Sequence, residues 1–203
     1  PFIQWKKAIL TYLSINKTAL KYGMILKDAT PFNFCHVGGK AILIDTSSFI
    51  FFKEPGYWNA YRQFCEEFLG PIVLMKFNGP SWAKLSGSML GGMPLPFLSK
   101  QLHLKTWLNL TTLINIHWHA RFSAADLNPK HEGEKKTIFT IEKINYFIDT
   151  FKNSIDNWNK PYQFKKKWLE YYEEGIESKE YLAEKELHIA NWLQQINPKS
   201  VVD

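Results

Sequence analysis

Two neighbouring stretches, "LKDATPFNF" (26–34) and "AILIDTSSF" (41–49), hold the pattern that decides the fold. The chain between Asn33 and Asp45 reads as two short strands joined by Gly38-Gly39. Consecutive glycines supply the positive φ angles that a tight hairpin turn requires, so this segment predicts a β-hairpin. A hairpin brings the end of its second strand back to the start of its first. Asp45 is therefore predicted to lie beside Asn33.

The polar residues of these stretches, Asp28, Asn33 and Asp45, are of the types that phosphoryl transfer from a nucleotide requires. The transition state is loose and highly charged, so catalysis depends on positioning and charge neutralisation. A carboxylate accepts the proton of the attacking hydroxyl, and Mg²⁺ prefers carboxylate, amide and phosphate oxygens. The pattern predicts Asp28 as the catalytic carboxylate and Asn33 and Asp45 as metal ligands. Pro31 stiffens the loop between them because its ring fixes φ.

Helical periodicity dominates the rest of the chain. Apolar residues recur at mostly helical spacing over 2–22, and Gly23 is a typical residue at the end of a helix. Further helices are expected at 58–75, 97–122 (one long segment or a broken one), 140–158, 162–172 and 178–196, with a polar loop at 128–136. Residues 78–96 are expected to form an irregular loop or short helical turns. Gly70-Pro71 is expected to break or kink the helix that contains it. The predicted fold class is α+β, mainly helical, with one small β-hairpin.

The composition restricts the classes of function. The 203 residues are 45% hydrophobic and 16% aromatic, enough to bury a core of one domain. A net charge of +6 is compatible with anionic ligands such as nucleotides, but the lysines are scattered, which argues against a nucleic-acid partner. Cys35 and Cys65 are isolated, which excludes a zinc site of CxxC spacing and fits a reducing cytoplasm. No apolar run reaches 18 residues, so no membrane span is expected.

"KDATPFN" followed by "ILIDTSSF" resembles the catalytic loop and metal-binding Asp of the protein kinase-like superfamily, which includes small-molecule phosphotransferases. Carried over residue by residue, the resemblance implies Asp28 as the catalytic residue and Asn33 and Asp45 as Mg²⁺ ligands. Lys27, Asn33 and Asp45 would together bind the ATP cofactor. The implied fold is the larger, C-terminal lobe of a kinase-like protein. Its substrates would be a nucleotide and a hydroxyl-bearing acceptor.

The chain departs from the kinase pattern at several positions. Leu26-Lys27 stand where protein kinases have His-Arg, and Thr46-Ser47 stand where they have Phe-Gly. No Gly-rich loop and no nucleotide-lobe lysine precede Asp28. The resemblance therefore covers a lobe whose N-terminal partner lobe is absent. It implies phosphoryl transfer only if a missing lobe completes the site.

A second resemblance covers most of the chain. "GMILKDATPFNF", "GGKAILIDTSSF" and "WNAYRQFCEEFLGPIVLM" are similar to the region that precedes the methyltransferase domain in a group of bacterial S-adenosylmethionine-dependent methyltransferases. "INPKSVVD" (196–203) resembles the opening of the first Rossmann-type strand of the class I enzymes. This implies a kinase-like region at 1–177, then a linker helix and the first strand of a truncated methyltransferase domain at 178–203. S-adenosylmethionine would bind only in the missing downstream part, and the parent protein would be cytoplasmic.

Alternative interpretations stand beside these. A D-x-x-P-x-N loop also makes a good turn, and Asp45 would serve equally as a cap for the turn at 46–48. The region would then be a non-catalytic module, either for interaction or for presenting substrate to the methyltransferase. His117 and His119 would share a metal only on a strand, since residues i and i+2 of a helix face different sides. Arg62 is a candidate partner for an acidic residue of the site.

Overall fold

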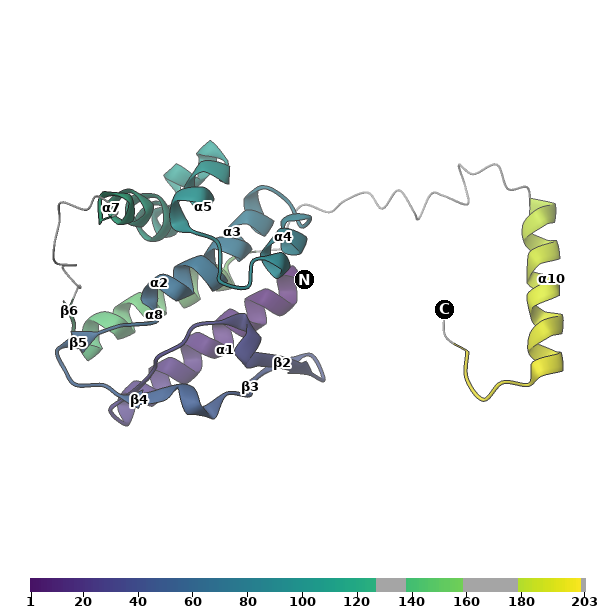
Figure 1. Ribbon diagram of the computed structural model, residues 1–203, viewed down its shortest axis with the longest axis horizontal. Helices are drawn as coiled ribbons and strands as arrows, with labels where there is room; N and C mark the ends of the chain where they lie inside the picture. The colour runs from purple at the N-terminus through teal and green to yellow at the C-terminus, as the bar shows by residue number, and fades with distance from the viewer. Residues whose placement is uncertain (127–137, 159–178, 202–203) are drawn as a thin grey trace. The chain divides into compact units, whose positions relative to one another are not determined.

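The computed structural model describes residues 1–126, 138–158 and 179–201, in two units, Pro1–Gln163 and Phe164–Asp203. The first half of the first unit mixes one long helix with short strands and 3₁₀ turns (Figure 1). The elements are α1 (Phe2–Lys21), β1 (Met24–Leu26), a 3₁₀ turn (Pro31–Asn33), β2 (Phe34–Val37), β3 (Lys40–Leu43), a second 3₁₀ turn (Thr46–Ser48), β4 (Phe49–Phe51) and β5 (Gly56–Tyr57).

The second half of this unit is mainly helical. Its elements are α2 (Tyr61–Gln63), a π-helix (Phe64–Leu69), α3 (Gly70–Phe77), α4 (Trp82–Ser88), α5 (Leu95–Gln101), a 3₁₀ helix (Leu104–Leu108), α6 (Leu110–Thr112), a π-helix (Leu113–Trp118), α7 (His119–Asp126), β6 (Ile138–Phe139) and α8 (Ile141–Asp156). The mainly helical α+β class is confirmed. The expected helix at 162–172 and loop at 128–136 lie outside the described residues.

The helix α1 organises the first unit. Its buried face includes Ile9, Tyr12, Leu13 and Leu20, which recur at the spacing of one helix face. The helix ends where Gly23 takes a φ of +68°, as predicted for a residue that stops a helix. α1 contacts α8 as well as β1 and β3 (Figure 1). It thus carries helices and strands on different sides.

The strands form three antiparallel pairs. The predicted hairpin is confirmed: β2 pairs with β3, with Phe34 opposite Leu43, and Gly38 and Gly39 take φ angles of +54° and +75° in the turn. β1 pairs with β4, so that Leu26 faces Phe49. β5 pairs with β6. The two ladders β1–β4 and β2–β3 flank the loop that contains Asp28.

α2, the π-helix at Phe64–Leu69 and α3 form one continuous helix over 61–77, here named the central helix. The expected break at Gly70-Pro71 is wrong, because the backbone is wound as a π-helix just before these residues. The N–H of Gly70 bonds to the carbonyl of Cys65, five residues earlier. In this widened turn the helix accommodates a proline that has no N–H to donate. The expected helix at 97–122, by contrast, is interrupted after Gln101.

Aromatic rings on the central helix form much of the core. Phe64 and Phe68 are fully buried, and Tyr61 and Trp58, which precedes the helix, pack beside them. Tyr12 of α1 stacks on Phe64 with ring centroids 5.6 Å apart and lies 5.5 Å from Phe68. These contacts join α1 to the central helix.

The second unit is described only over α10 (Lys179–Ile196) and the five residues 197–201 that follow it. α10 agrees with the helix expected at 178–196. No strand forms over 197–201, and residues 202–203 lie outside the description. The predicted boundary at 177–178 also falls there, so the two-part division stays a prediction. No helix in the described ranges combines the length and apolar character that a membrane crossing needs.

We predict that Gly70→Ala destabilises the fold by about 1–3 kcal/mol, the usual cost of overpacking. A Cβ at Gly70 would collide with the side chain of buried Leu98 and approach the Cys65 carbonyl oxygen to 3.1 Å. The matched control is Gly87→Ala in α4, where a Cβ meets no atom within 4 Å. The control should be neutral or slightly stabilising. Urea unfolding of both variants checks this, and equal midpoints would contradict it.

A second prediction concerns alkaline pH. Burial raises the pKa of the Cys65 thiol and of the Tyr12 and Tyr61 phenols. The unfolded chain therefore binds fewer protons than the folded chain at high pH, and stability falls as pH rises. The fall should begin near pH 8.5, the usual thiol pKa, and steepen above about pH 10, by up to about 1.4 kcal/mol per pH unit for each group. Urea unfolding from pH 7 to 11 measures it, and Cys65→Ala should delay its onset to about pH 10.

Candidate functional site

Asn33 and Asp45 lie side by side at the base of the hairpin. The Asn33 side-chain amide donates a hydrogen bond to Oδ2 of Asp45, with 3.2 Å between the two atoms. The backbone N–H of Ile44 donates to the Asn33 carbonyl at 2.9 Å, which continues the β2–β3 ladder to this point. The predicted neighbourhood of the two residues is therefore confirmed. Their role as metal ligands stays a prediction.

The other oxygen of Asp45 caps the turn that follows. Oδ1 accepts hydrogen bonds from the hydroxyl of Ser47 at 2.7 Å and from its backbone N–H at 2.9 Å. These bonds lower the pKa of the Asp45 carboxyl, and the positive charge of Lys27 lowers it further. The Ser48 hydroxyl donates to the Asp45 carbonyl at 3.1 Å. Asp45 thus has the capping role of the alternative interpretation and the Asn33 contact of the catalytic one at the same time.

The Asp28 loop is held by hydrogen bonds on its backbone. The N–H of Leu26 donates to Oδ1 of Asn16, and the N–H of Ala29 donates to Oε1 of Gln63, at 3.0 and 2.9 Å. Between them, the N–H of Lys27 donates to the Ser48 carbonyl at 2.9 Å. Hydrogen bonds to three separate elements therefore fix the loop backbone: to α1, to the central helix and to the turn after Asp45.

Sequence analysis missed Asn16 and Gln63. Asn16 is fully buried on the apolar face of α1. A buried amide requires a polar partner. The position of Asn16 within an apolar helix face was therefore the sequence feature that could have indicated a contact with another segment. Gln63 is itself positioned by Glu67, whose carboxylate accepts a hydrogen bond from Nε2 of Gln63 at 2.9 Å. That pair follows i,i+4 helical spacing, which the sequence also contains.

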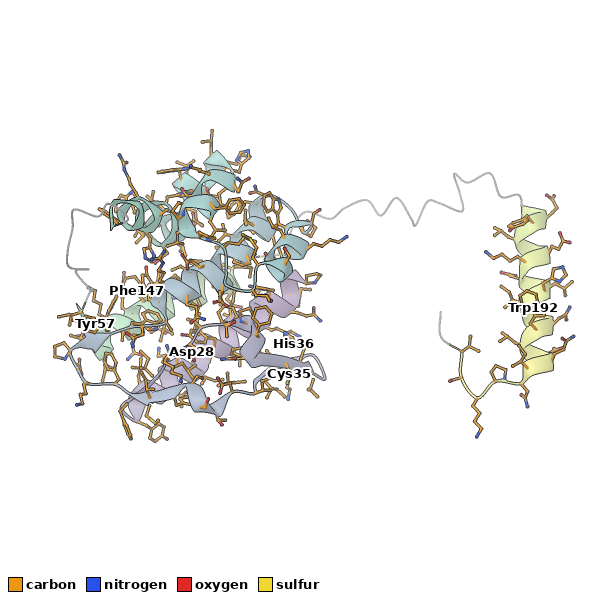
Figure 2. All side chains as sticks on the ribbon, viewed as in Figure 1. Asp28, Cys35, His36, Tyr57, Phe147 and Trp192 are labelled. Atoms are coloured by element: carbon orange, nitrogen blue, oxygen red, sulfur yellow. The ribbon has the colours of Figure 1, made fainter. Side chains whose placement is uncertain are left out.

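Asp28 and Lys27 occupy the loop between β1 and the Pro31–Asn33 turn. Asp28 is partly exposed and Lys27 is exposed. Figure 2 shows Asp28 in the same unit as the hairpin residues Cys35 and His36. No described hydrogen bond joins the Asp28 carboxylate to Asn33 or Asp45. The link between the Asp28 loop and this pair runs through the backbone. Lys27, which precedes Asp28, bonds to Ser48, which lies in the turn that Asp45 caps.

An apolar groove adjoins this loop system. It has a volume of about 630 Å³ and is lined by Ile15, Thr18 and Ala19 of α1, by Met24, and by Thr46 and Phe49, together with Ser14 and Tyr22. Thr46 directly follows Asp45. The lining offers few polar groups, so the groove is unsuited to a triphosphate, and the candidate site is the partly exposed Asn33–Asp45 edge.

The two histidines of "HWH" have separate environments. Both ring nitrogens of His117 have hydroxyl partners, Ser99 at 2.8 Å and Thr106 at 2.9 Å, and burial lowers its pKa. His119 stacks on Tyr61 with ring centroids 5.2 Å apart. In the described ranges, no group of three or more His, Cys, Asp or Glu side chains is arranged to hold a metal ion.

Arg62 does not pair with an acidic residue of the site. Its Nε forms an ion pair with Oε1 of Glu66, one helical turn along, at 3.1 Å. The expectation that it joins the site is therefore wrong. Helical i,i+4 spacing made the local partner available at a lower ordering cost.

Comparison with known proteins yields one informative similarity. No family model and no solved structure matches the chain. Among curated proteins, it is similar to the nodulation protein NoeA of Rhizobium meliloti (strain 1021), with 28% identity over 127 residues. The match covers 61% of this chain and 26% of NoeA. The chain thus spans about a quarter of the length of this relative.

We predict that Ser47→Ala raises the pKa of the Asp45 carboxyl toward its usual range. The variant removes the hydroxyl donor to Oδ1, the largest cause of the lowered pKa, and keeps the backbone donor. Carboxyl ¹³C NMR titration measures the change. Ser88→Ala is the control, since the Ser88 hydroxyl donates to the Leu85 carbonyl instead. An unchanged Asp45 titration in Ser47→Ala would contradict the assigned cause.

Proposed function

We propose that this region carries a Mg²⁺–nucleotide half-site for phosphoryl transfer to a hydroxyl-bearing substrate. The observation that carries the proposal is the 3.2 Å hydrogen bond between Asn33 and Asp45, which places an amide and a carboxylate together at a partly exposed edge. The half-site belongs to a region resembling the larger lobe of a kinase-like fold. A second lobe would complete it.

The donor chemistry of the pair fits Mg²⁺. The amide nitrogen of Asn33 donates to Asp45, so its amide oxygen is left as an acceptor, and Asp45 adds a carboxylate. Mg²⁺ in nucleotide sites uses one or two carboxylates, with phosphate oxygens and waters supplying the rest. When bound, it would neutralise phosphate charge. The lowered pKa of Asp45 keeps this carboxylate ionised over a wider range of pH.

Asp28 is suited to act as the general base. It would accept the proton of the substrate hydroxyl while that oxygen bonds to phosphorus and the bond from phosphorus to the leaving nucleotide oxygen breaks. The backbone bonds from Leu26 and Ala29 to Asn16 and Gln63 hold its loop in place. Such rigidity supports catalysis because the base must sit within hydrogen-bond reach of the hydroxyl. Lys27, exposed beside Asp28, would contact a phosphate oxygen of ATP.

For the parent protein we propose a methyltransferase tethered after this region, in a bacterial cytoplasm. Support comes from the resemblance of 23–75 and 196–203 to bacterial methyltransferases. The similarity to a much longer bacterial protein, NoeA, is compatible with a multi-part parent. S-adenosylmethionine would then bind downstream of Asp203. The name of NoeA refers to nodulation and specifies no acceptor for the phosphoryl or the methyl group.

A second candidate function is a non-catalytic interaction or substrate-presenting module. The observation that favours it is the capping of the Thr46–Ser48 turn by Asp45, whose Oδ1 already accepts two hydrogen bonds from Ser47. If the role of Asp45 is only to cap this turn, its position is explained without a bound metal. The two functions differ in whether Mg²⁺ and ATP bind.

The test is calorimetric titration of the full-length protein with ATP, in Mg²⁺ and again in EDTA. We expect binding that EDTA abolishes and that Asp45→Asn weakens at least about tenfold, a loss typical of perturbed metal sites. Asp149→Asn is the control, because Asp149 pairs with Lys17 on α1. Absence of Mg²⁺-dependent binding, with cellular activity intact in Asp45→Asn, would overturn the half-site and favour the interaction module.

A further inference from the structure

Besides Nδ2 of Asn16, two buried polar groups near the Asp28 loop have no hydrogen-bond partner among the described residues. They are the hydroxyl of Tyr12, on α1, and the indole N–H of Trp58, just before the central helix. Tyr12 is fully buried and Trp58 is 4% exposed. Buried donors without acceptors cost folding free energy, so nearly all of them in native proteins are satisfied. An acceptor for this donor pair is therefore expected nearby.

The rings that carry these groups are fixed. Tyr12 packs against Phe64 and Phe68, with ring centroids 5.6 and 5.5 Å apart. Trp58 lies 5.3 Å from the ring of Tyr61 and 6.1 Å from that of Phe139. Neither ring can turn its polar atom toward solvent without opening the aromatic core. The acceptor must come to them.

Asp28 is the candidate acceptor, because its loop bonds to Asn16, one turn beyond Tyr12 on α1, and to Gln63, which directly precedes Phe64. Burial raises the pKa of Tyr12, the neighbouring Trp58 N–H opposes that rise, and the negative charge of Asp28 adds to it, so both groups act on the phenol. The Asp28 carboxylate receives no hydrogen bond from any described residue, while the backbone on both sides of it is anchored to Asn16 and Gln63. A change of side-chain rotamer, with the loop backbone held, brings a carboxylate to new partners at small cost.

We infer that Tyr12 and Trp58 are positioning residues for Asp28: their buried O–H and N–H hold its carboxylate, directly or through one buried water. A carboxylate held by two donors presents one defined oxygen to a substrate hydroxyl. The inference rests on the proposed function for its purpose, since a general base requires a fixed orientation. The contact itself does not depend on any ligand.

The test is a double-mutant cycle on folding stability at pH 7, with Tyr12→Phe, Asp28→Ala and the pair. Interacting side chains give non-additive effects, and distant ones add. We expect the unfolding equilibrium constant of the double variant to differ by about threefold or more from the product of the single effects. Trp58→Phe, which removes the N–H and keeps an aromatic ring, should couple to Asp28→Ala in the same way.

Matched controls make the outcome specific. Tyr146→Phe removes a phenol that is 71% exposed, and Asp156→Ala removes a carboxylate that faces Lys6 instead. Tyr146→Phe should show no coupling to Asp28→Ala, and Asp156→Ala should show no coupling to Tyr12→Phe. Additive effects for both Tyr12 and Trp58 with Asp28 would overturn the inference.

The same variants separate this inference from the proposed function. Coupling without Mg²⁺-dependent ATP binding by the full-length protein would overturn the proposed half-site and leave the Tyr12–Trp58–Asp28 contact standing. Binding of ATP without coupling would do the reverse. If both hold, Tyr12→Phe should lower kcat for phosphoryl transfer several-fold with KM for ATP unchanged, because the hydroxyl acts on the base and not on the nucleotide.

Discussion

The contact between Tyr12 and the paired rings of Phe64 and Phe68 is the junction on which the first unit depends. It joins α1 to the central helix, and these two elements carry the side chains that hold the Asp28 loop. Asn16 lies one turn beyond Tyr12 on α1, and Gln63 directly precedes Phe64. The aromatic packing therefore fixes the separation between the two amides. The loop backbone in turn bonds to both of them.

Features set by local sequence could be predicted. The hairpin follows from the Gly38-Gly39 turn, and its closure places Asp45 beside Asn33 whatever the rest of the chain does. α1 follows from apolar spacing and its end from Gly23.

Features set by packing between distant segments could not be predicted from the sequence. Nothing local to Gln63 indicates that its side chain accepts from Ala29, which is 34 positions away. The continuity of the central helix through Gly70-Pro71 depends on a π-helical turn and on the approach of Leu98, neither of which is encoded near the proline. Arg62 was misassigned for the opposite reason, since a partner on its own helix was overlooked in favour of a distant one.

The π-helical turn at Phe64–Leu69 has a consequence for how this chain tolerates change in length. Each π turn contains one residue more than the α-helical turn it replaces. Loss of a single residue here would restore regular α-helical bonding and leave α3 in nearly the same orientation relative to α2, whereas loss of a residue from a regular α-helical turn would rotate everything after it by about 100°. Ile72, Leu74 and their neighbours would then still face the core, and Gln63 would stay under the Asp28 loop. The central helix therefore tolerates the loss of one residue between Gln63 and Gly70, whereas a deletion within α3 would turn the residues after it away from the core.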